Sequence, residues 1–288
     1  MKIAVYGSRR QDAHFQEIEA FMSRAAELGI EIVMHSKLYK HLRAVMLPAL
    51  SAVRRVTDTS DFTADAAVSI GGDGTFLRTA MWIADKEIPI VGVNTCHLGY
   101  LTALGVERLV EVPDLLLSGK LEAERRGLIE VESPELPTWP YALNEVTVSK
   151  DDSASMISTC ATLDGHLLAE YRADGLIVAT ATGSTAYNLS VGGPIVDPRT
   201  PAWAISPIAA HALTMRPLVV ADSSRLTLCP SARAEHFRLA IDGRAFSLPV
   251  GTEVRLRRAK FEVVLLHLPG YSFSETLRNK LHWGMEGY

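Results

Sequence analysis

The sequence has few cysteines and only a small excess of negative charge. Its 288 residues include three cysteines, Cys96, Cys160 and Cys229, which are scattered and form no CxxC pair. This excludes a disulfide-stapled scaffold and predicts three small, buried, apolar side chains. The formal net charge is −4 at pH 7. No overall basic field therefore favours binding to nucleic acid or to an anionic membrane.

Long apolar runs are also absent. The first segment turns polar at Ser8-Arg9-Arg10, too early for the apolar core of a signal peptide, and no stretch could span a bilayer. The nine histidines show no HExxH or similar spacing, so we predict no metal-ligating residues of a dedicated zinc site. We expect a soluble, cytoplasmic protein that binds neither membrane nor nucleic acid.

What is present is the composition of an ordinary globular protein, with 48% hydrophobic and 22% charged residues. Up to about residue 118, strand-like apolar runs alternate with segments of helical spacing, which predicts a mostly parallel sheet. Ligands of such sheets bind at the carboxyl ends of the strands, where Asp73 and Asn94 fall. The expected strands are Lys2–Tyr6, Glu31–Met34, Ala66–Ile70 and Ile88–Val93, and the expected helices are 15–28, 76–84 and 107–117.

The pattern changes after residue 118, where many short strands are separated by turn signals such as Asp164-Gly165 and Asp242-Gly243. This predicts an all-β region with helices at Ser184–Ser190 and near Ala202–Ala210. A weak helical period follows in the tail. We therefore predict an α/β domain over residues 1–118, a β-rich domain over 119–270 and a C-terminal tail over 271–288.

The sharpest motif is Gly71-Gly72-Asp73-Gly74-Thr75, directly after a buried-type strand. Glycines there let backbone N–H groups approach a phosphate, and the following helix offers its positive end. The charge of Asp73 would repel that phosphate. It therefore indicates either a Mg²⁺ ion between the two or a base for an attacking hydroxyl. The plain alternative is a glycine-rich turn with an aspartate cap.

Two further segments carry polar groups in strand-like surroundings. The segment 171–187 joins a buried strand to small, hydroxylated residues, which would let a flat ligand sit close, and Asp174 could bind a ribose or an amide edge. Its alternative is a loop with Ser184 as a helix N-cap. Asn144 and Glu145 interrupt a second strand pattern. Successive strand residues face opposite sides, so they share a pocket only if the strand ends or bulges there.

Together these segments resemble the NAD kinases, which phosphorylate the adenosine-side 2′-hydroxyl of NAD to give NADP. The resemblance covers nearly the whole chain in order. Its motifs are GGDGT at 71–75, NTCHLGYLT at 94–102, LNEVTV at 143–148, YRADGLIVAT at 171–180, TGSTAYNLSVGGPIV at 182–196, ISPIAAHALTMRPLVV at 205–220 and IDG at 241–243.

The resemblance implies a Rossmann-like α/β domain, a β-sandwich-like domain, and a tail that returns to the first. It implies a homodimer or homotetramer that uses Mg²⁺ or another divalent cation, with NAD and ATP or another phosphoryl donor as substrates. Asp73 is then the catalytic aspartate, and Phe76 lines the pocket. The other implied binding residues are Gly72, Gly74, Thr75, Asn144, Glu145, Asp174, Ser184, Thr185, Ala186, Tyr187 and Ser190.

Three positions depart from the family pattern. Ala181 stands where we expect proline, and Ala209-Ala210-His211-Ala212-Leu213 lacks the expected proline and serine. Arg244 replaces the glutamine expected after Asp242-Gly243, where it could contact a phosphate or only lie on the surface.

GGDGT alone also occurs in lipid kinases, so a lipid kinase is one alternative. A dinucleotide sensor without catalysis is another, because fold does not fix function. The donor, the use of NADH and feedback by NADP(H) stay open.

Overall fold

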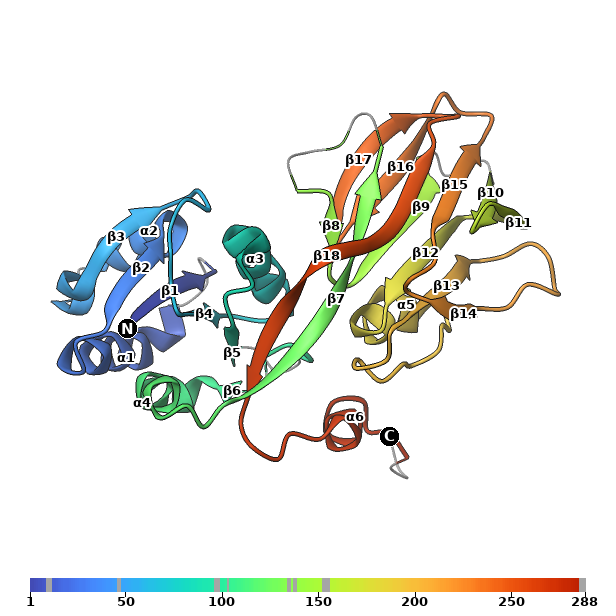
Figure 1. Ribbon diagram of the computed structural model, residues 1–288. Helices are drawn as coiled ribbons and strands as arrows, with labels where there is room; N and C mark the ends of the chain where they lie inside the picture. Colours follow the sequence, from blue (N-terminus) through green and yellow to red (C-terminus); the bar gives the residue numbers. More distant parts are fainter. Residues whose placement is uncertain are drawn as a thin grey trace. The chain divides into compact units, whose positions relative to one another are not determined.

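The computed structural model describes residues 1–8, 12–45, 48–95, 99–102, 104–133, 136, 139–151 and 156–284. The chain forms two compact units (Figure 1). Unit 1 comprises Met1–Arg125 together with Val263–Tyr288, and unit 2 comprises Arg126–Glu262. Among the described residues, no helix is both long and apolar enough to cross a bilayer.

Unit 1 is an α/β domain, as predicted. Its sheet has the order β18-β5-β4-β1-β2-β3, and every pairing within it is parallel. Its strands are β1 (Lys2–Gly7), β2 (Glu31–His35), β3 (Val53–Thr57), β4 (Ala66–Ile70), β5 (Ile90–Asn94), β6 (Leu104–Gly105) and the end of β18 (Val254–His267). Its helices are α1 (Phe15–Glu27), α2 (Ser36–Ala44), α3 (Asp73–Ile83), α4 (Val112–Ser118) and α6 (Phe273–Leu281), with 3₁₀ helices η1 (Asp12–His14), η2 (Pro48–Ala52), η3 (Ala84–Lys86) and η4 (Val106–Glu111).

The alternation of side chains along the strands sorts these helices onto two faces. On β1, Ile3 and Val5 pack in one core cluster with buried residues of α1, α2 and α4. Tyr6 points to the other face, where its ring lies 5.9 Å from that of Trp82 on α3. The helix expected over 107–117 is divided into η4 and α4. Pro113 lies at the start of α4 and has no N–H to continue the preceding helical turn.

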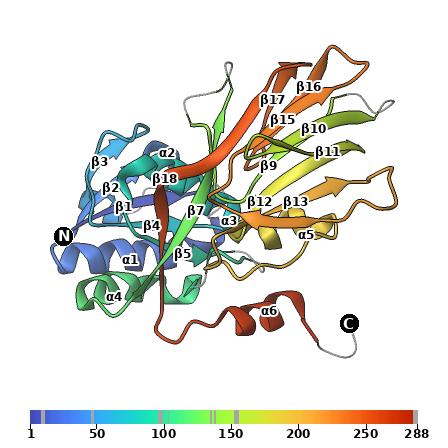
Figure 2. The same ribbon diagram turned by 45° about the vertical axis from the view of Figure 1, so that its right-hand side comes forward.

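Unit 2 is built from two sheets of mostly short strands. One contains β11-β10-β15-β18 with β7 and β8, and the other has the order β14-β13-β12-β9-β16-β17. Figure 2 shows β7 and β18 running side by side. The further elements are β7 (Glu122–Glu132), β8 (Tyr141–Ala142), β9 (Glu145–Lys150), β10 (Ile157–Leu163), β11 (His166–Ala173), β12 (Gly175–Thr180), η5 (Thr182–Thr185), α5 (Tyr187–Ser190), β13 (Ala202–Ile208), β14 (Leu218–Ala221), β15 (Leu226–Ser231), β16 (His236–Ile241) and β17 (Arg244–Pro249).

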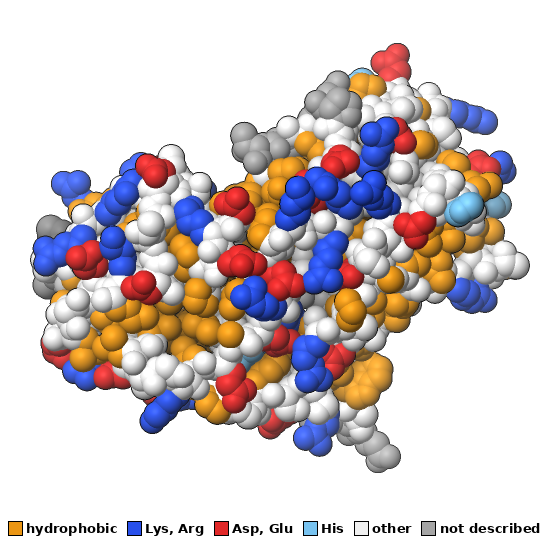
Figure 3. All heavy atoms as spheres, in the orientation of Figure 1, with side chains coloured by type: hydrophobic (Ala, Val, Ile, Leu, Met, Phe, Trp, Pro, Cys, Tyr) orange, Lys and Arg blue, Asp and Glu red, His pale blue; other side chains and the backbone are white. Residues whose placement is uncertain are grey.

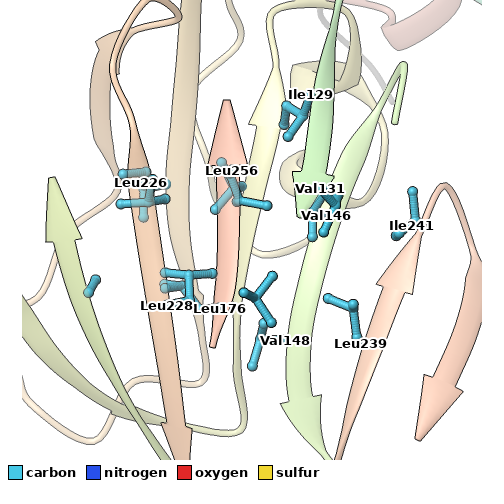
Figure 4. Packing of buried hydrophobic residues seen from close by; sticks show 14 of the residues in the cluster. Ile129, Val131, Val146, Val148, Leu176, Leu226, Leu228, Leu239, Ile241 and Leu256 are labelled. Atoms are coloured by element: carbon cyan, nitrogen blue, oxygen red, sulfur yellow. The ribbon is translucent and has the colours of Figure 1, made fainter. Parts of the chain in front are cut away.

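The core of unit 2 lies between its two sheets, which confirms the β-sandwich-like prediction. Leu176 on β12, Val148 on β9 and Leu228 on β15 are fully buried in one cluster and face one another in Figure 4. Truncating such a leucine to alanine typically costs about 2–5 kcal/mol. The short helix expected near Ala202–Ala210 is wrong. Those residues form β13, which pairs with β12 on one side and β14 on the other.

Candidate active site

Asp73 is the first residue of α3, three residues before the predicted start of that helix. The chain leaves β4 through Gly71, whose φ of +151° favours glycine. A Cβ atom on Gly71 would lie 2.4 Å from the hydroxyl of Thr75, so the turn needs a glycine for space as well. The turn places Asp73 at the positive end of α3, beside the carboxyl ends of the adjacent strands β4 and β5.

The carboxylate of Asp73 is held by a loop that follows β5. Its Oδ2 accepts a hydrogen bond from the backbone N–H of Tyr100 at 2.6 Å. Its Oδ1 accepts from the N–H of Leu101 at 3.0 Å and from the hydroxyl of Thr102 at 3.2 Å. A Cβ on Gly99 would lie 2.8 Å from this Oδ1 and 3.1 Å from Nδ2 of Asn94. Three donors therefore fix the orientation of the carboxylate, and Gly99 leaves room for it.

The rest of the GGDGT motif divides into exposed and buried residues. Gly74 is exposed, and no heavy atom would lie within 4 Å of a Cβ placed there. Gly72 is half-buried, whereas Thr75 is buried and accepts a hydrogen bond from Arg78 at 3.4 Å. Phe76 is fully buried. The expected role of Phe76 in lining a pocket stays a prediction, because its side chain packs inside unit 1.

A small cavity adjoins the loop that holds Asp73. It has a volume of about 210 Å³. Gly99 and Tyr100 line it from the loop, and the residues leading into α6 and along that helix line it from the tail. Burial, with Tyr271 and Asp73 nearby, raises the pKa of Tyr100 to about 12. The Tyr100 hydroxyl is therefore a neutral group at ordinary pH, close to the candidate catalytic carboxylate.

In unit 2, Asn144 and Glu145 lie where a strand begins. The chain bends at 143–144 between β8 and β9, so the strict alternation of a strand does not separate the two side chains. Asp242 holds this bend. Its carboxylate accepts hydrogen bonds from the N–H groups of Leu143 and Asn144, both at 2.8 Å, and of Glu145 at 3.2 Å. The sequence predicts that Asn144 and Glu145 can share a pocket only if the strand ends or bulges at them, and the structure places a strand end there.

Glu145 has an unusual electrostatic environment. Burial, and then the nearby carboxylate of Asp242, raise the pKa of Glu145 to about 7, while a hydrogen bond from the Tyr187 backbone acts in the opposite direction. Its Oε2 is buried and has no hydrogen-bond partner among the described residues. Burial also raises the pKa of Asp242, against three backbone donors and the nearby Arg244. Such an unsatisfied, perturbed carboxyl group is typical of a binding or catalytic site.

The hydroxylated segment after β12 packs directly on this bend. Thr180 donates its backbone N–H to the carbonyl oxygen of Asn144 at 2.9 Å and its hydroxyl to that of Leu143 at 2.6 Å. A Cβ on Gly183 would lie 2.0 Å from the same Asn144 oxygen. The structure therefore brings the segment from η5 to α5 together with Asn144 and Glu145.

Within this segment the predicted contacts differ in accessibility. Tyr187 and Ser190 are exposed, and Thr185 and Ala186 are half-buried. Ser184 is fully buried, and its hydroxyl donates to the carbonyl oxygen of Ala181 at 2.7 Å and accepts from the N–H of Val196 at 3.0 Å. Ser184 is not the N-cap of α5, because that helix begins at Tyr187. Its hydroxyl fastens the loop.

Asp174 lies apart from the residues just described. It precedes β12, whereas η5 follows β12, and Glu145 pairs with Ala179 near the far end of that strand. Five strand residues correspond to roughly 17 Å. The carboxylate of Asp174 is 41% exposed and forms an ion pair with Lys150 at 2.7 Å. Within one chain, Asp174 and Glu145 therefore lie at opposite ends of the β9–β12 strand pair.

Arg244 does not lie free on the surface. It is half-buried, and its guanidinium donates to the backbone oxygens of Trp139, Tyr141 and Ile241 at 2.8, 3.0 and 3.2 Å. Burial lowers its pKa, an effect that nearby Asp242 opposes. Arg244 therefore fastens the segment that leads into the 143–145 bend.

Sequence reasoning missed several of these groups. The Asp242-Gly243 pair indicated a hairpin turn, and the turn is present between β16 and β17, but the carboxylate of Asp242 binds a segment almost a hundred residues away. The sequence pattern also assigns no role to residues 100–102, although they belong to the NTCHLGYLT stretch. Only the place of residues 100–102 in the sequence indicates a role in the site, because they follow a strand that ends at the ligand-binding edge of the sheet.

Charges of both signs are interspersed on the face shown in Figure 3. In unit 2, two basic side chains of β18 pair with carboxylates: Arg257 with Glu130 and Arg258 with Asp222, both at 2.8 Å. Among the described residues, no three His, Cys, Asp or Glu side chains form a group that could hold a metal ion.

Comparison with known proteins agrees with this arrangement. The family model described as "ATP-NAD kinase N-terminal domain" matches residues 9–121. The model described as "ATP-NAD kinase C-terminal domain" matches residues 143–268. The chain is 41% identical over 283 residues to an NAD kinase of Porphyromonas gingivalis, with 98% of each chain covered. The chain belongs to the NAD kinase family. An NAD kinase of Bacteroides fragilis is 36% identical over 288 residues, with 99% of each chain covered.

Solved structures of NAD kinases share the fold. An Archaeoglobus fulgidus NAD kinase in complex with ATP has a TM-score of 0.73 and 26% identity, over 98% of this chain and 97% of that one. A yeast NADH kinase complexed with NADH has a TM-score of 0.89 and 20% identity, over 100% of this chain and 89% of that one. The order of an α/β unit followed by a β-rich unit is therefore the arrangement expected of an NAD kinase.

Proposed function

We propose that this chain transfers a phosphoryl group from ATP, or from another phosphoryl donor, to the 2′-hydroxyl of the adenosine ribose of NAD, giving NADP. The observation that carries the proposal is the oriented carboxylate of Asp73 in the glycine-rich turn at the start of α3. Membership of the NAD kinase family supplies the acceptor and the donor class. We also propose that unit 1 binds the phosphates and that unit 2 binds the dinucleotide.

Asp73 accepts the proton of the ribose hydroxyl in this proposal. The three donors of the 99–102 loop leave lone pairs of its two oxygens for a further hydrogen bond. A carboxylate is a weak base for an alcohol, so proton transfer comes late, when the bond to the leaving group is already loosened. Positioning and neutralisation of charge then carry most of the catalysis.

A divalent cation fits the donor set if the phosphates supply most of its ligands. Mg²⁺ usually keeps several waters and binds one or two carboxylates together with substrate phosphates. Asp73 is one such carboxylate, and the amide of Asn94 lies beside the same loop. Mg²⁺ would neutralise charge on the phosphates. We propose that it is bound together with the donor, with Asp73 as the protein residue nearest to it.

Asn144, Glu145 and the exposed part of the 185–190 segment form the proposed dinucleotide site. Their proximity in unit 2 supports this, as does the unsatisfied oxygen of Glu145, which could accept a hydrogen bond from a ribose hydroxyl or protonate to donate one. We propose that Thr185, Ala186, Tyr187 and Ser190 contact NAD, while the Ser184 hydroxyl keeps the loop in place.

Asp174 supports the prediction of a homodimer or homotetramer. Because it lies roughly 17 Å along β12 from the other unit 2 residues, we propose that Asp174 of one copy completes the site of another. Mixing D73N and D174N subunits tests this. If Asp174 acts on a second copy, the mixed oligomer recovers activity that neither variant has alone. If no activity returns although mixed oligomers form, Asp174 serves its own chain.

One coupled assay tests the proposed reaction. The purified chain is incubated with Mg²⁺ and NAD or NADH, with ATP or inorganic polyphosphate as donor, and NADP(H) is measured. We expect NADP that depends on both donor and metal. Binding of NAD without any product would indicate a sensor, and phosphorylation of diacylglycerol in place of NAD would indicate a lipid kinase. A cytoplasmic location stays a prediction from the sequence.

A further inference from the structure

Two cysteines that are far apart in the sequence are direct neighbours in the structure. Cys160 on β10 and Cys229 on β15 are opposite one another in the antiparallel register of the two strands. Cα atoms of such pairs are about 4.5 or 5.5 Å apart, depending on the type of pair. Both values lie within the roughly 4.4–6.8 Å that a disulfide requires.

Both thiols lie on the outer face of their sheet. On β10, Thr159 and Ala161 are buried while Cys160 is half-buried, and on β15, Leu228 is buried while Cys229 is exposed. The outward row of this strand pair consists of like residues throughout: Ser158 with Ser231, Cys160 with Cys229, and Thr162 with Thr227. The expectation that these cysteines are buried apolar side chains is wrong. Cys96 lies outside the described residues.

We propose that Cys160 and Cys229 form a reversible disulfide when the protein meets a low-molecular-weight disulfide such as oxidised glutathione. The more exposed thiolate, that of Cys229, attacks the oxidant. A bond forms between Cys229 and one glutathione sulfur, and the second glutathione leaves as a thiolate. The thiolate of Cys160 then attacks the Cys229 sulfur and releases the first glutathione. Two protein thiols are oxidised, one disulfide is reduced to two thiols, and the leaving thiolates take up the two protons.

Reversibility follows from the cross-strand position. Cβ atoms of directly opposite residues are about 4.5–5.5 Å apart, whereas those of a disulfide are about 3.5–4.5 Å apart. Closing the bond therefore draws the strands together, and strained, exposed disulfides are reduced most easily. Partial desolvation of the Cys229 sulfur by its neighbours, with Glu253 and Cys160 nearby, raises the pKa of this thiol, and Arg255 acts in the opposite direction. Oxidation should therefore accelerate as the pH rises.

The crosslink would close a large part of unit 2 into one loop. The chain between the two cysteines includes the β10–β11 hairpin, Asp174, β12 and the whole 182–190 segment. Closing a loop of roughly 70 residues restricts the unfolded chain strongly, and disulfides of this kind commonly raise Tm by on the order of 5 °C. We expect oxidation to stabilise the unit that carries the proposed dinucleotide site.

Peptide mapping tests the proposal on the full chain. The protein is incubated with oxidised glutathione, alkylated under denaturing conditions, digested and analysed by mass spectrometry, which also separates Cys96 from the pair. We expect linked Cys160 and Cys229 peptides, restoration of both thiols by dithiothreitol, and a higher Tm for the oxidised protein. In C160S, Cys229 should remain as a stable mixed disulfide with glutathione.

A matched control keeps two thiols on the same face but out of register. In S158C/C160S the new thiol is diagonal to Cys229, about 7–8 Å away, and should not crosslink. If Cys160 and Cys229 of the unmodified sequence remain free thiols after incubation with oxidised glutathione, the proposal is overturned. Linkage between chains in place of within one chain, or equal crosslinking of the control, would overturn it as well.

Discussion

The carboxylates of Asp73 in unit 1 and Asp242 in unit 2 accept hydrogen bonds in nearly the same arrangement. Each carboxylate accepts hydrogen bonds from three successive residues of a distant segment, Tyr100 to Thr102 for one and Leu143 to Glu145 for the other. For Asp242 all three donors are backbone N–H groups, whereas one of the donors to Asp73 is a hydroxyl. The shared geometry therefore does not by itself assign a function.

The surroundings separate the two carboxylates. Asp73 starts a helix beside the exposed Gly74, where a ligand can reach it. Asp242 lies in a hairpin turn, with φ angles of +46° for itself and +75° for Gly243, and burial raises its pKa. Both aspartates are half-buried, so the difference lies in what their carboxylates hold: Asp73 lies at a helix start beside an exposed glycine, whereas Asp242 fixes the 143–145 bend. Asp73 is thus a candidate catalytic residue, and Asp242 is a positioning residue for Asn144 and Glu145.

Substitution of Asp73 should have the largest effect on turnover. D73N keeps the size of the side chain and one acceptor oxygen but removes the proton acceptor, so kcat should fall by about 10³-fold or more. The Kd for NAD, measured by calorimetry, should change little. D85N, which alters an exposed carboxylate just after α3, is the matched control and should keep full activity. Near-normal turnover of D73N would remove Asp73 from the mechanism.

Substitution of Asp242 should affect stability and binding of NAD more than the chemical step. D242A leaves three backbone N–H groups without their acceptor and should lower the free energy of unfolding by about 3 kcal/mol or more. The KM for NAD should rise at least tenfold while kcat changes less, because the 143–145 bend loosens. D242N should recover part of the loss. D151N, which breaks an exposed ion pair with Arg238, should cost at most about 1 kcal/mol in a urea titration. A fall in kcat as large as the rise in the KM for NAD would contradict a positioning role for Asp242.

Substitutions of two glycines near Asp73 separate the orientation of its carboxylate from the access of a ligand to it. G99A places a Cβ against Thr102 and Asp73, so it should disturb the loop and lower both stability and kcat. G74A meets no protein atom and should raise stability by about 0.5–1 kcal/mol, since it adds a better helix former. It should nevertheless raise the KM for ATP several-fold by blocking the approach of a phosphate. If G74A instead leaves this KM unchanged in a donor titration, the phosphates bind elsewhere.

The sequence predicted the parts of this arrangement that depend on neighbouring residues. The strand before GGDGT, the helix after it and the Asp242-Gly243 hairpin are all present, because burial patterns and turn residues act over a few positions. The donors to Asp73 lie 27 to 29 residues away, and those to Asp242 lie 97 to 99 residues away. Such contacts depend on tertiary packing, and no local pattern encodes them. The pairing of Cys160 with Cys229 was unpredictable for the same reason.

The buried Glu145, with Asp242 nearby, should cause a pH dependence of stability. The pKa of Glu145 is raised from 4.5 to about 7, so between these values the native state keeps a proton that the unfolded state has released. The free energy of unfolding should therefore fall as the pH rises through this window, by about 3 kcal/mol at most, and level off above it. E145Q should remove this slope in urea titrations at successive pH values. D242N should narrow the window, because it deletes the negative charge that raises the Glu145 pKa. An unchanged slope in E145Q would show that a group other than Glu145 carries the proton. Asp242, whose pKa burial also raises, would then be the group to test.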